Sequence, residues 1–587
     1  MLPRWRMLPW LSAAVILVSF VPVYALAADH PAMIPATRWY ILAVVVLAGL
    51  TLHFLLSRAD ARNRTVLEQR PTPDEATQRT KTQRREGAKI PLVLFASWRL
   101  GVNLFSGEHV SIALAALVVS YIAATVVLAT YRWRILTLGN VDSAIVMQSL
   151  RYTLDEGRLF FNTLEKVSHL AVHSSPIYFL LLPLYALCRS PQAFLTLLPP
   201  ICIGISAIPF FAIARPRLGP AAAFCLTAAY LLYPSIMARS VGDLYEMTLF
   251  PCLWLPAFYY YDRRRLGPFL LFVLLSLAVK ESIAATVLLF ALYGLIQRRG
   301  LVWIASPALL SALSLILSFA VIMPGFGAAS VSSRMAAFLG PFGASPQGLL
   351  RYALGQPLAF LRAVLSLPKL GLVYQLFQPF LFIPPFLSNE ILFALPALGL
   401  NLLAQGGSIG IRAWESAIFG PLLFVATIFG VQRLAARWRE WGVADDSAHE
   451  TRQTATLALA VTVFFATLAC APYWFRLDDY RPRPYLAVQE AAVALIPSEA
   501  SVSAPDYMMA RFAERPYLQL QTGPPFWAEY HIVDVHWIAS VRGHRLPERA
   551  AQEYIALVAR AEQGQIYEGL RLVWGGDGIY VFKRTEG

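Results

Sequence analysis

The sequence predicts an α-helical polytopic membrane protein that ends in a small α/β domain. Of its 587 residues, 57% are hydrophobic and only 14% are charged, and the mean hydropathy is +0.55. Soluble domains have an apolar share of about half. Apolar runs of roughly 17–25 residues, enough to cross a bilayer, recur almost to residue 472. We therefore expect about 11–13 transmembrane helices, followed by a polar tail, residues 473–587, that folds in water.

The first 57 residues contain two of the predicted spans. The chain starts with the basic MLPRWR, continues with an apolar stretch and reaches Ala25-Leu26-Ala27, as a signal peptide or a retained first helix would. A retained helix is favoured, because the stretch is long and a second span follows soon after. Residues 58–90 are polar, basic and contain proline, which predicts a disordered cytoplasmic linker. Residues 91–472 form the predicted membrane core.

The net charge of +14 indicates a membrane rather than a nucleic acid as partner. In a soluble protein this excess would suggest nucleic acid, but the arginines here cluster at the ends of apolar segments, as the positive-inside bias requires. The five cysteines lie in or beside apolar segments, and the tail has none. Neither a disulfide framework nor a cysteine metal site is indicated.

The positions of the basic residues predict which loops share a side of the membrane. The cytoplasmic linker makes the span near 108–130 run outward, which places Asp142 outside. Two spans between residues 192 and 240 then separate Asp142 from DLYE (243–246) on the same outer side. This count requires that PIYFLLLPLYAL (176–187) does not cross, and its short length and two prolines predict a re-entrant or interfacial helix. If that helix crosses, Asp142 and DLYE lie on opposite sides.

The later spans place Lys280-Glu281 and the tail on the outer side as well, with RLAARWREW (433–441) inside. These spans are expected near 301–323, 371–388, 390–404, 416–433 and 453–472.

The tail has the pattern of a small α/β domain. ASVSA (500–504) and EYHIVDV (529–535) alternate or run apolar as strands do. GLRLVWGGDGIYVFKR predicts a β-hairpin that turns at Gly575-Gly576-Asp577-Gly578. Residues 548–562 predict a helix with four apolar residues on one face. These are Ala551, Tyr554, Ile555 and Val558.

Acidic residues are costly near a membrane, so those at the outer edge of the spans are candidate functional groups. Asp142 has an ordinary structural reading as the cap of the helix that follows it, and this role is compatible with catalysis. Asp243 and Glu246 are three residues apart, which puts both carboxylates on one face if the turn is helical. Such a pair suits a divalent cation, Mg²⁺ or Mn²⁺, or a phosphate-bound cation; the alternative is a solvated loop.

Several basic groups lie on the same side. His173 is either a donor to a phosphate or a surface residue. Lys280 and Glu281 either form ion pairs at a helix end or contact phosphate. The first outer loop contains four cations, although the positive-inside rule predicts few basic residues there. These cations suit an anionic ligand such as a lipid phosphate. The alternative is that they contact only lipid headgroups. The four cations are Arg151, Arg158, Lys166 and Arg189.

Short motifs resemble those of a widespread, largely uncharacterised family of predicted bacterial and archaeal membrane proteins, a domain of unknown function placed in the GT-C superfamily of polytopic glycosyltransferases. The resemblance covers about residues 105–510. The motifs are N-x-D-x-x-x-x-x-Q (140–148), HSSPIYFLLLPLY (173–185), F-x-I-A-R-x-R-L-G (211–219), YLLYP (230–234), KE (280–281) and IPSEASVSA (496–504).

The resemblance implies a GT-C-like fold and transfer of a sugar from a polyprenyl-phosphate donor, with inversion, to an acceptor of the cell envelope outside the bacterial inner membrane. It maps Asp142 to the catalytic acid of the first outer loop, and Asp243 with Glu246 to a second acidic motif that assists phosphate or metal binding. The leaving phosphate would be stabilised by Arg151, Lys280 or His173, or by a cation. The chain departs from the family in having Tyr245 where a histidine is usual and Ser282 where an acid is usual.

Two other classes of protein remain open. A transporter or flippase of an anionic substrate also needs many spans, but it predicts essential charges near the bilayer midplane and inverted repeats. A non-catalytic envelope assembly protein would act through its tail. For such a protein, deletion of 473–587 abolishes function and Asp142→Asn does not.

Overall fold

The computed structural model describes most of the chain from residue 109 onward. The predicted N-terminal spans and the linker lie outside the described residues. The described ranges are 109–327, 339–343, 345–382, 384–404, 410–411, 414–440, 448–473, 475–543 and 546–585.

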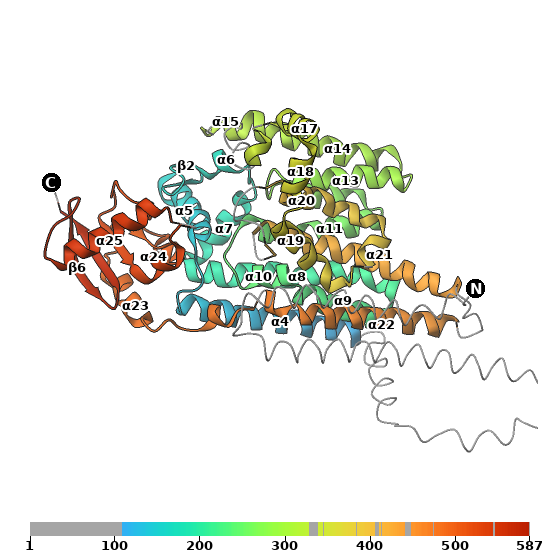
Figure 1. Cartoon of the computed structure of the whole chain (residues 1–587). Helices are drawn as coiled ribbons and strands as arrows, with labels where there is room; N and C mark the ends of the chain where they lie inside the picture. The colour runs from blue at the N-terminus through green and yellow to red at the C-terminus, as the bar shows by residue number, and fades with distance from the viewer. Residues whose placement is uncertain are drawn as a thin grey trace, which may run out of the picture.

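These residues form a bundle of long apolar helices with a small α/β domain at one end (Figure 1). By length and composition, five helical segments are able to cross a membrane, and two further pairs qualify if each bent pair counts as one span. The five segments are Val110–Arg134 in α4 (His109–Arg134), α8 (Pro191–Leu218), Leu301–Gly325, Ser416–Arg437 and Gln453–Tyr473. The bent pairs are α9 (Pro220–Leu232) with α10 (Pro234–Ser240), and Pro357–Val364 with Leu367–Phe380.

The predicted class, a helical polytopic membrane protein, is confirmed, but several apolar runs are broken. Between α9 and α10 the axis bends by 59°. Tyr233 there has an extended backbone, because the ring of Pro234 disfavours a helical conformation in the residue before it. The predicted span near 390–404 is the shorter helix Asn389–Leu403. Span counts based on hydropathy alone therefore exceed the number of unbroken helices.

The other helices of the bundle are α11 (Phe250–Asp262), α12 (Leu266–Leu277), α13 (Ile283–Ile296), α14 (Leu301–Ile316), η5 (Leu317–Ile322), α15 (Met323–Gly325), α17 (Pro346–Gly355), α18 (Pro357–Val364), α19 (Leu367–Phe377), α20 (Leu395–Leu403), α21 (Phe419–Glu440) and α22 (Ala448–Ala469). The 3-10 turns among and after them are η4 (Glu246–Leu249), η6 (Gly340–Phe342), η7 (Gln378–Phe380), η8 (Pro384–Leu387), η9 (Asn389–Ala394), η10 (Trp414–Ile418), η11 (Ala471–Tyr473) and η12 (Leu477–Tyr480).

The first large loop, between α4 and α8, is itself folded. It contains α5 (Val141–Glu156), a two-stranded antiparallel hairpin, α6 (His169–Val172) and α7. Helix α7 (Tyr178–Cys188) has 11 residues and contains Pro183. At about 1.5 Å per residue it is about 17 Å long, against about 30 Å for a hydrocarbon core. The prediction of a helix too short to cross is confirmed. The hairpin strands are β1 (Phe161–Asn162) and β2 (Val167–Ser168).

The C-terminal domain is a five-stranded sheet of order β4-β3-β5-β7-β6. Strand β3 pairs in parallel with β4 and β5, whereas β5, β7 and β6 are antiparallel. The predicted strands, hairpin and helix are all present. Ile555 is nevertheless 40% exposed, and Leu557 is buried in its place. The elements are α23 (Leu486–Leu495), β3 (Val502–Ala504), η13 (Asp506–Phe512), β4 (Leu518–Leu520), β5 (Tyr530–Asp534), α24 (Val535–Val541), α25 (Glu548–Glu562), β6 (Leu570–Gly576) and β7 (Ile579–Arg584).

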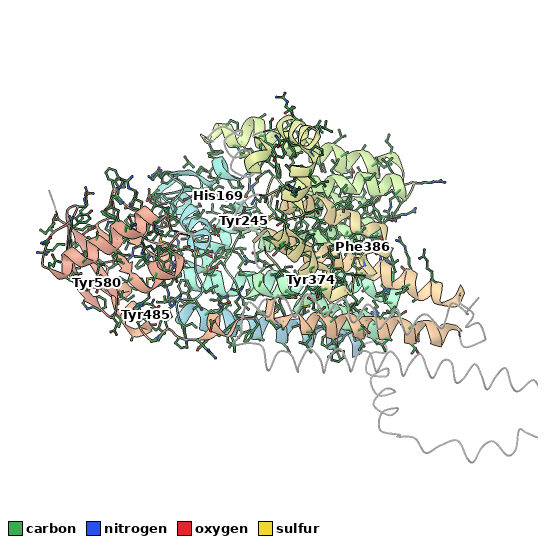
Figure 2. All side chains as sticks on the ribbon, in the orientation of Figure 1. His169, Tyr245, Tyr374, Phe386, Tyr485 and Tyr580 are labelled. Atoms are coloured by element: carbon green, nitrogen blue, oxygen red, sulfur yellow. The ribbon has the colours of Figure 1, made fainter. Side chains whose placement is uncertain are left out.

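This domain packs directly on the first large loop. Leu136 and Ala144 share an apolar cluster with buried residues of the sheet. The hydroxyl of Thr163 donates to Leu518 O at 3.0 Å and accepts from Leu518 N at 2.8 Å. In Figure 2, His169 and Tyr245 lie at the end of the bundle that faces the domain. Further contacts between DLYE, Lys280-Glu281 and this loop, given below, place all of them at one end of the bundle, as predicted.

Candidate functional site

Asp142 lies in the first turn of α5 but does not cap the helix. The cap is Asn140, whose side-chain oxygen accepts from Ser143 N at 3.2 Å. The capping role predicted for Asp142 is therefore wrong, because the residue two positions earlier already occupies it. Among the described residues, the one hydrogen bond of the Asp142 carboxylate is from the Asn140 amide, at 3.3 Å.

Two other carboxylates hold the start of α5 in place. Asp243 Oδ1 accepts from Gly139 N at 2.7 Å and from Asn140 N at 3.0 Å. Asp506, from the C-terminal domain, accepts from Val141 N at 2.9 Å. Free backbone N–H groups at a helix N-terminus favour negative charge, so both contacts stabilise this end of α5. Together they fix the position from which the Asp142 side chain projects.

The chain passes close to the C-terminal domain at Gly139. Its φ is +113°, and a Cβ atom there would lie 2.7 Å from the Cβ atom of Ala510. Ala510 N also donates to Gly139 O at 3.2 Å. Only glycine suits this position, because other residues would be strained and would push the domain away.

The surroundings of Asp142 raise the pKa of its carboxyl to about 7. Burial is the main cause, since it disfavours the charged form. The negative charges of Asp243, Asp506 and Glu246 add to the effect, and Arg239 opposes it. Asp142 is therefore a carboxylate that gains and loses a proton near neutral pH.

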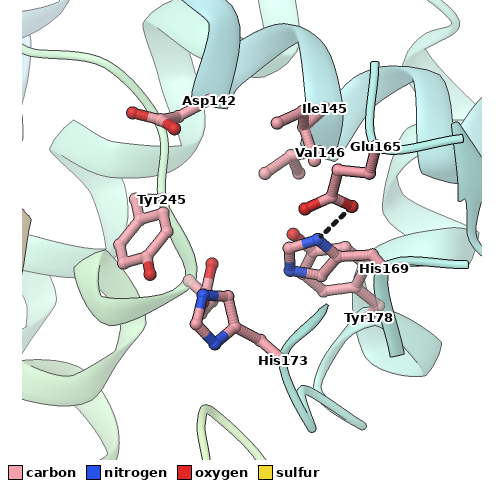
Figure 3. A pocket seen from close by; sticks show the side chains of 9 residues that line it. Asp142, Ile145, Val146, Glu165, His169, His173, Tyr178 and Tyr245 are labelled. Carbon is pink, nitrogen blue, oxygen red and sulfur yellow. Dashed lines mark hydrogen bonds and ion pairs between the residues drawn. The ribbon is translucent and has the colours of Figure 1, made fainter. Parts of the chain in front are cut away.

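Asp142 faces a cavity of about 130 Å³ (Figure 3). The figure shows Asp142 and Tyr245 on one side and Glu165, His169 and Tyr178 on the other. The lining residues come from α5, the β-hairpin, α6, the start of α7 and DLYE. They are Asp142, Ile145, Val146, Glu165, His169, His173, Tyr178, Tyr245 and Glu246.

Glu165 and His169 form a buried pair that the sequence analysis did not identify. His169 Nδ1 lies 3.0 Å from Glu165 Oε2, which also accepts from Asn162 Nδ2 at 2.7 Å. Burial favours the neutral forms, but the hydrogen bond and opposite charges outweigh it: the pKa of Glu165 is lowered and the pKa of His169 is raised. The pairing thus favours a protonated imidazole.

The cavity contains polar atoms without partners. The His169 ring stacks on Tyr178 with ring centres 5.0 Å apart. His169 Nε2 and the Tyr178 hydroxyl are buried, and neither has a hydrogen-bond partner in the described part of the chain. Buried polar groups are usually hydrogen-bonded, so each unpaired group requires an explanation. A polar ligand in the cavity would satisfy both.

Lys280 and Glu246 form a second pair at the cavity wall. Lys280 Nζ lies 3.8 Å from Glu246 Oε1 and donates to the Tyr245 hydroxyl. Glu246 is 1% exposed, and its two oxygens accept no hydrogen bond within the described residues. This hydrogen bond holds the Tyr245 hydroxyl at the cavity wall. Lys280 thus acts on the cavity electrostatically, through its hydrogen bond to the Tyr245 hydroxyl.

His173 and Glu281 form a third pair, which joins HSSP to Lys280-Glu281. His173 Nδ1 lies 3.0 Å from Glu281 Oε1, and Ser174 N donates to Oε2 at 2.9 Å. Burial raises the pKa of Glu281, but His173 and Lys280 outweigh it, and the pKa falls to about 2. Glu281 is therefore ionised at neutral pH and orients His173.

The structure places Asp243 and Glu246 differently from what their spacing predicts. Asp243 lies in the loop before the turn η4, which begins at Glu246, so the prediction of a shared helix face is wrong. No group of three or more His, Cys, Asp or Glu among the described residues is arranged to hold a metal ion. The two acids do not fit a Mg²⁺ or Mn²⁺ site, because one binds backbone N–H groups and the other pairs with Lys280.

Arg151 lies further along α5 and does not line the cavity. It is 3.6 Å from both Asp155 and Glu156.

Four residues of the site were not predicted from the sequence, namely Glu165, His169, Tyr178 and Asp506. A weak signal exists for the first pair, because glutamate and histidine are separated by four residues. Asp506 gives no such signal, since its contact with Val141 joins positions 365 residues apart.

The fold and the site define a polytopic helical membrane protein in which the first large loop and DLYE line a cavity around the half-buried carboxylate of Asp142, with a C-terminal α/β domain packed on the same loop. The chain belongs to the DUF2079 family of predicted membrane proteins, whose profile matches residues 132–564. The resemblance seen in the sequence motifs is thereby confirmed. No match was found among curated proteins.

The solved structures that are similar to the chain include two of one protein. One is ArnT from Cupriavidus metallidurans bound to undecaprenyl phosphate, which is 10% identical, with 79% of this chain and 97% of that chain covered and a TM-score of 0.46. The other is the same protein in the apo state, also 10% identical, with 80% and 98% covered and a TM-score of 0.44.

Proposed function

We propose that the protein is a membrane glycosyltransferase of the GT-C type, which transfers a sugar from a polyprenyl-phosphate donor to an acceptor hydroxyl of the cell envelope. The distribution of charge around the cavity carries this proposal. Glu165 and Glu281 each pair with a histidine, and Glu246 pairs with Lys280. Asp142 has no ion pair among the described residues, and its pKa is about 7. It is the carboxylate left available to accept a proton.

Asp142 acts as the general base in this proposal. A general base works best when its pKa lies near the working pH, and about 7 meets that condition. Asp142 takes the proton of the acceptor hydroxyl while the hydroxyl oxygen forms a bond to the anomeric carbon. The bond from that carbon to the donor phosphate oxygen breaks at the same time, with inversion. The electron pair leaves with the polyprenyl phosphate.

The opposite wall stabilises the leaving phosphate. His169 Nε2 and the Tyr178 hydroxyl are buried donors without partners in the described part of the chain. Donors that are already in place where negative charge develops lower the barrier, and they act most strongly where water is excluded. Lys280 adds positive charge through the Tyr245 hydroxyl. No step requires a metal ion.

The variant Asp142→Asn tests the proposal in membranes supplied with a labelled polyprenyl-linked sugar. Loss of a general base typically slows a reaction about 10²–10⁴-fold, and we expect a loss in that range. The control is Asp155→Asn, which makes the same change on α5 away from the cavity and leaves transfer normal.

Unchanged transfer by Asp142→Asn at wild-type expression overturns the proposal. The assay also separates a transferase from a flippase, because movement of a lipid across the bilayer forms no new glycosidic bond.

A further inference from the structure

A second, larger cavity of about 610 Å³ lies between the first large loop and the C-terminal domain. Its lining contains four aromatic and two cationic side chains and no acidic one. We call this cavity the groove. Its lining residues are Tyr152, Arg158, Phe161, Thr163, Lys166, Ser501, Tyr517 and Trp527.

The two walls of the groove are bonded to each other. Thr163, in the β-hairpin loop, exchanges two hydrogen bonds with the backbone of Leu518. The hydroxyl of Tyr152 donates to Pro516 O. These contacts fix the loop against the start of β4, so the groove is formed before any ligand binds.

Neither cation of the groove has an acidic partner among the described residues. Arg158 and Lys166 are exposed, and neither side chain has a hydrogen bond or ion pair with another described residue. The Arg158 guanidinium lies 3.4 Å from the centre of the Phe161 ring and 5.4 Å from that of Tyr152. The rings hold the guanidinium in place while its N–H groups remain available. Such a group suits bidentate contact with a carboxylate or a phosphate.

Lys166 adopts a backbone conformation that lysine rarely takes. Its φ is 60°, in the left-handed region where glycine and asparagine are less strained. Strained residues that persist in a structure often have a functional reason. The position keeps a positive charge facing the groove although another residue would fit the turn more easily.

Two aromatic side chains of the C-terminal domain line the opposite wall. Trp527 is 56% exposed, and its backbone N–H is fixed by Gln519 Oε1 at 2.8 Å. Tyr517 lines the groove as well. Aromatic rings pack well against the C–H faces of sugar rings, and the hydroxyl of tyrosine adds a polar contact. Aromatic faces beside unpaired cations are complementary to a saccharide that carries acidic groups.

We propose that the groove binds an acidic saccharide chain, which is the acceptor if the proposed transferase function holds. The same hairpin region serves both sites: Lys166 lines the groove, whereas Glu165 and His169 line the cavity of Asp142. A chain bound in the groove therefore lies beside the loop that forms the catalytic cavity. Trp527 and Tyr517 stack on its rings, and Arg158 and Lys166 bind its carboxylate or phosphate groups.

The test measures binding of a fluorescent tetrasaccharide of alternating glucuronic acid and N-acetylglucosamine to the purified full chain in detergent. We expect binding that weakens as salt is added, and at least about tenfold weaker binding of a neutral N-acetylglucosamine tetrasaccharide. Lys166→Asn removes the charge but suits the left-handed backbone, so the fold should persist. Lys166→Asn and Trp527→Ala should each weaken binding about tenfold.

The matched control is Arg571→Gln, which removes an exposed charge on β6, at the edge of the sheet opposite β4. This variant should bind like the wild type. Equal binding by all variants, or equal affinity for the neutral chain, overturns the proposal. Binding to phosphatidylglycerol vesicles that is lost in the groove variants, with none to the saccharide, also overturns it and assigns the groove to lipid headgroups.

Binding by Asp142→Asn separates this proposal from the proposed function. Asp142 is outside the groove, so this variant should bind the acidic tetrasaccharide normally even if transfer is lost. Normal transfer by Asp142→Asn would refute the proposed function and leave the binding result to decide the groove by itself.

Discussion

Replacement of Asp506 by asparagine tests whether the C-terminal domain adjusts the proposed catalytic base. Asp506 accepts a hydrogen bond from Val141 N at 2.9 Å, and the side-chain oxygen of asparagine can accept the same bond. The substitution therefore removes a negative charge and keeps the contact. Its effect on Asp142 is electrostatic.

The surroundings raise the pKa of Asp142 from 3.8 to about 7. At about 1.36 kcal/mol per pKa unit, this difference corresponds to about 4 kcal/mol of preference for the neutral form. Burial contributes most, followed by Asp243 and then Asp506. Asp506→Asn removes the third contribution alone. The pKa of Asp142 should fall by part of the difference and stay above 3.8.

The assay is kcat/KM for sugar transfer between about pH 5 and about pH 9, because this profile reports the pKa of the essential base in the free enzyme. In the wild type the rate should rise through about pH 7 as Asp142 loses its proton. In Asp506→Asn the rise should shift to lower pH, with a similar plateau. Asp506→Ala also removes the hydrogen bond, and loss of the positioned N-terminus of α5 should lower the plateau roughly tenfold.

A rise that stays at the wild-type pH, or moves to higher pH, in normally folded Asp506→Asn refutes the reasoning. Normal folding is checked by the thermal unfolding of both variants in detergent.

Two more predictions concern charge in the cavity. Glu165→Gln removes the partner that keeps the pKa of His169 raised, so the fall of the transfer rate at alkaline pH should move to lower pH. A fall that stays at the wild-type pH would contradict the role of His169. The control is Glu156→Gln, which makes the same change on α5. At about pH 8, Asp142→Asn should have a larger free energy of unfolding than the wild type, by at most about 4 kcal/mol, and should therefore unfold at a higher temperature. Because the folded-state pKa of about 7 lies above the unfolded value of about 3.9, wild-type stability is lost as pH rises through this window, and the difference should vanish towards pH 4. An equal difference at both pH values would show that the carboxyl does not titrate as argued.

Much of the fold follows from local sequence patterns. Helix α25 has the predicted bounds, 548–562, because its apolar period and polar flanks are contained in one stretch of sequence. The hairpin β6–β7 is specified in the same way by its glycine-rich turn. Spans were harder to count, because hydropathy gives the apolar character of a run but not the bend that Pro234 introduces. The charge pattern predicted correctly that Asp142, DLYE and Lys280-Glu281 lie together at one end of the bundle.

The candidate site was predictable only in part. Asp142, Tyr245 and His173 belong to short motifs near predicted span ends, and all three line the cavity. The role of Asp243 was not predictable, because its hydrogen bonds to Gly139 and Asn140 cross more than a hundred positions of the sequence. Neighbouring residues carry no information about such a contact. A carboxylate whose sequence pattern suits a metal ion can thus be a structural acceptor for backbone N–H groups.

The position of Asp506 also changes what a truncation can prove. Loss of function after deletion of 473–587 would fit a non-catalytic protein that acts through its tail. The same deletion, however, removes the hydrogen bond to Val141, the packing of Ala510 on Gly139 and one wall of the groove. A transferase would fail as well, because the helix that carries its base would lose its support. Only substitutions that preserve the domain, Asp142→Asn and Asp506→Asn among them, can distinguish a domain that binds a partner from one that completes an active site.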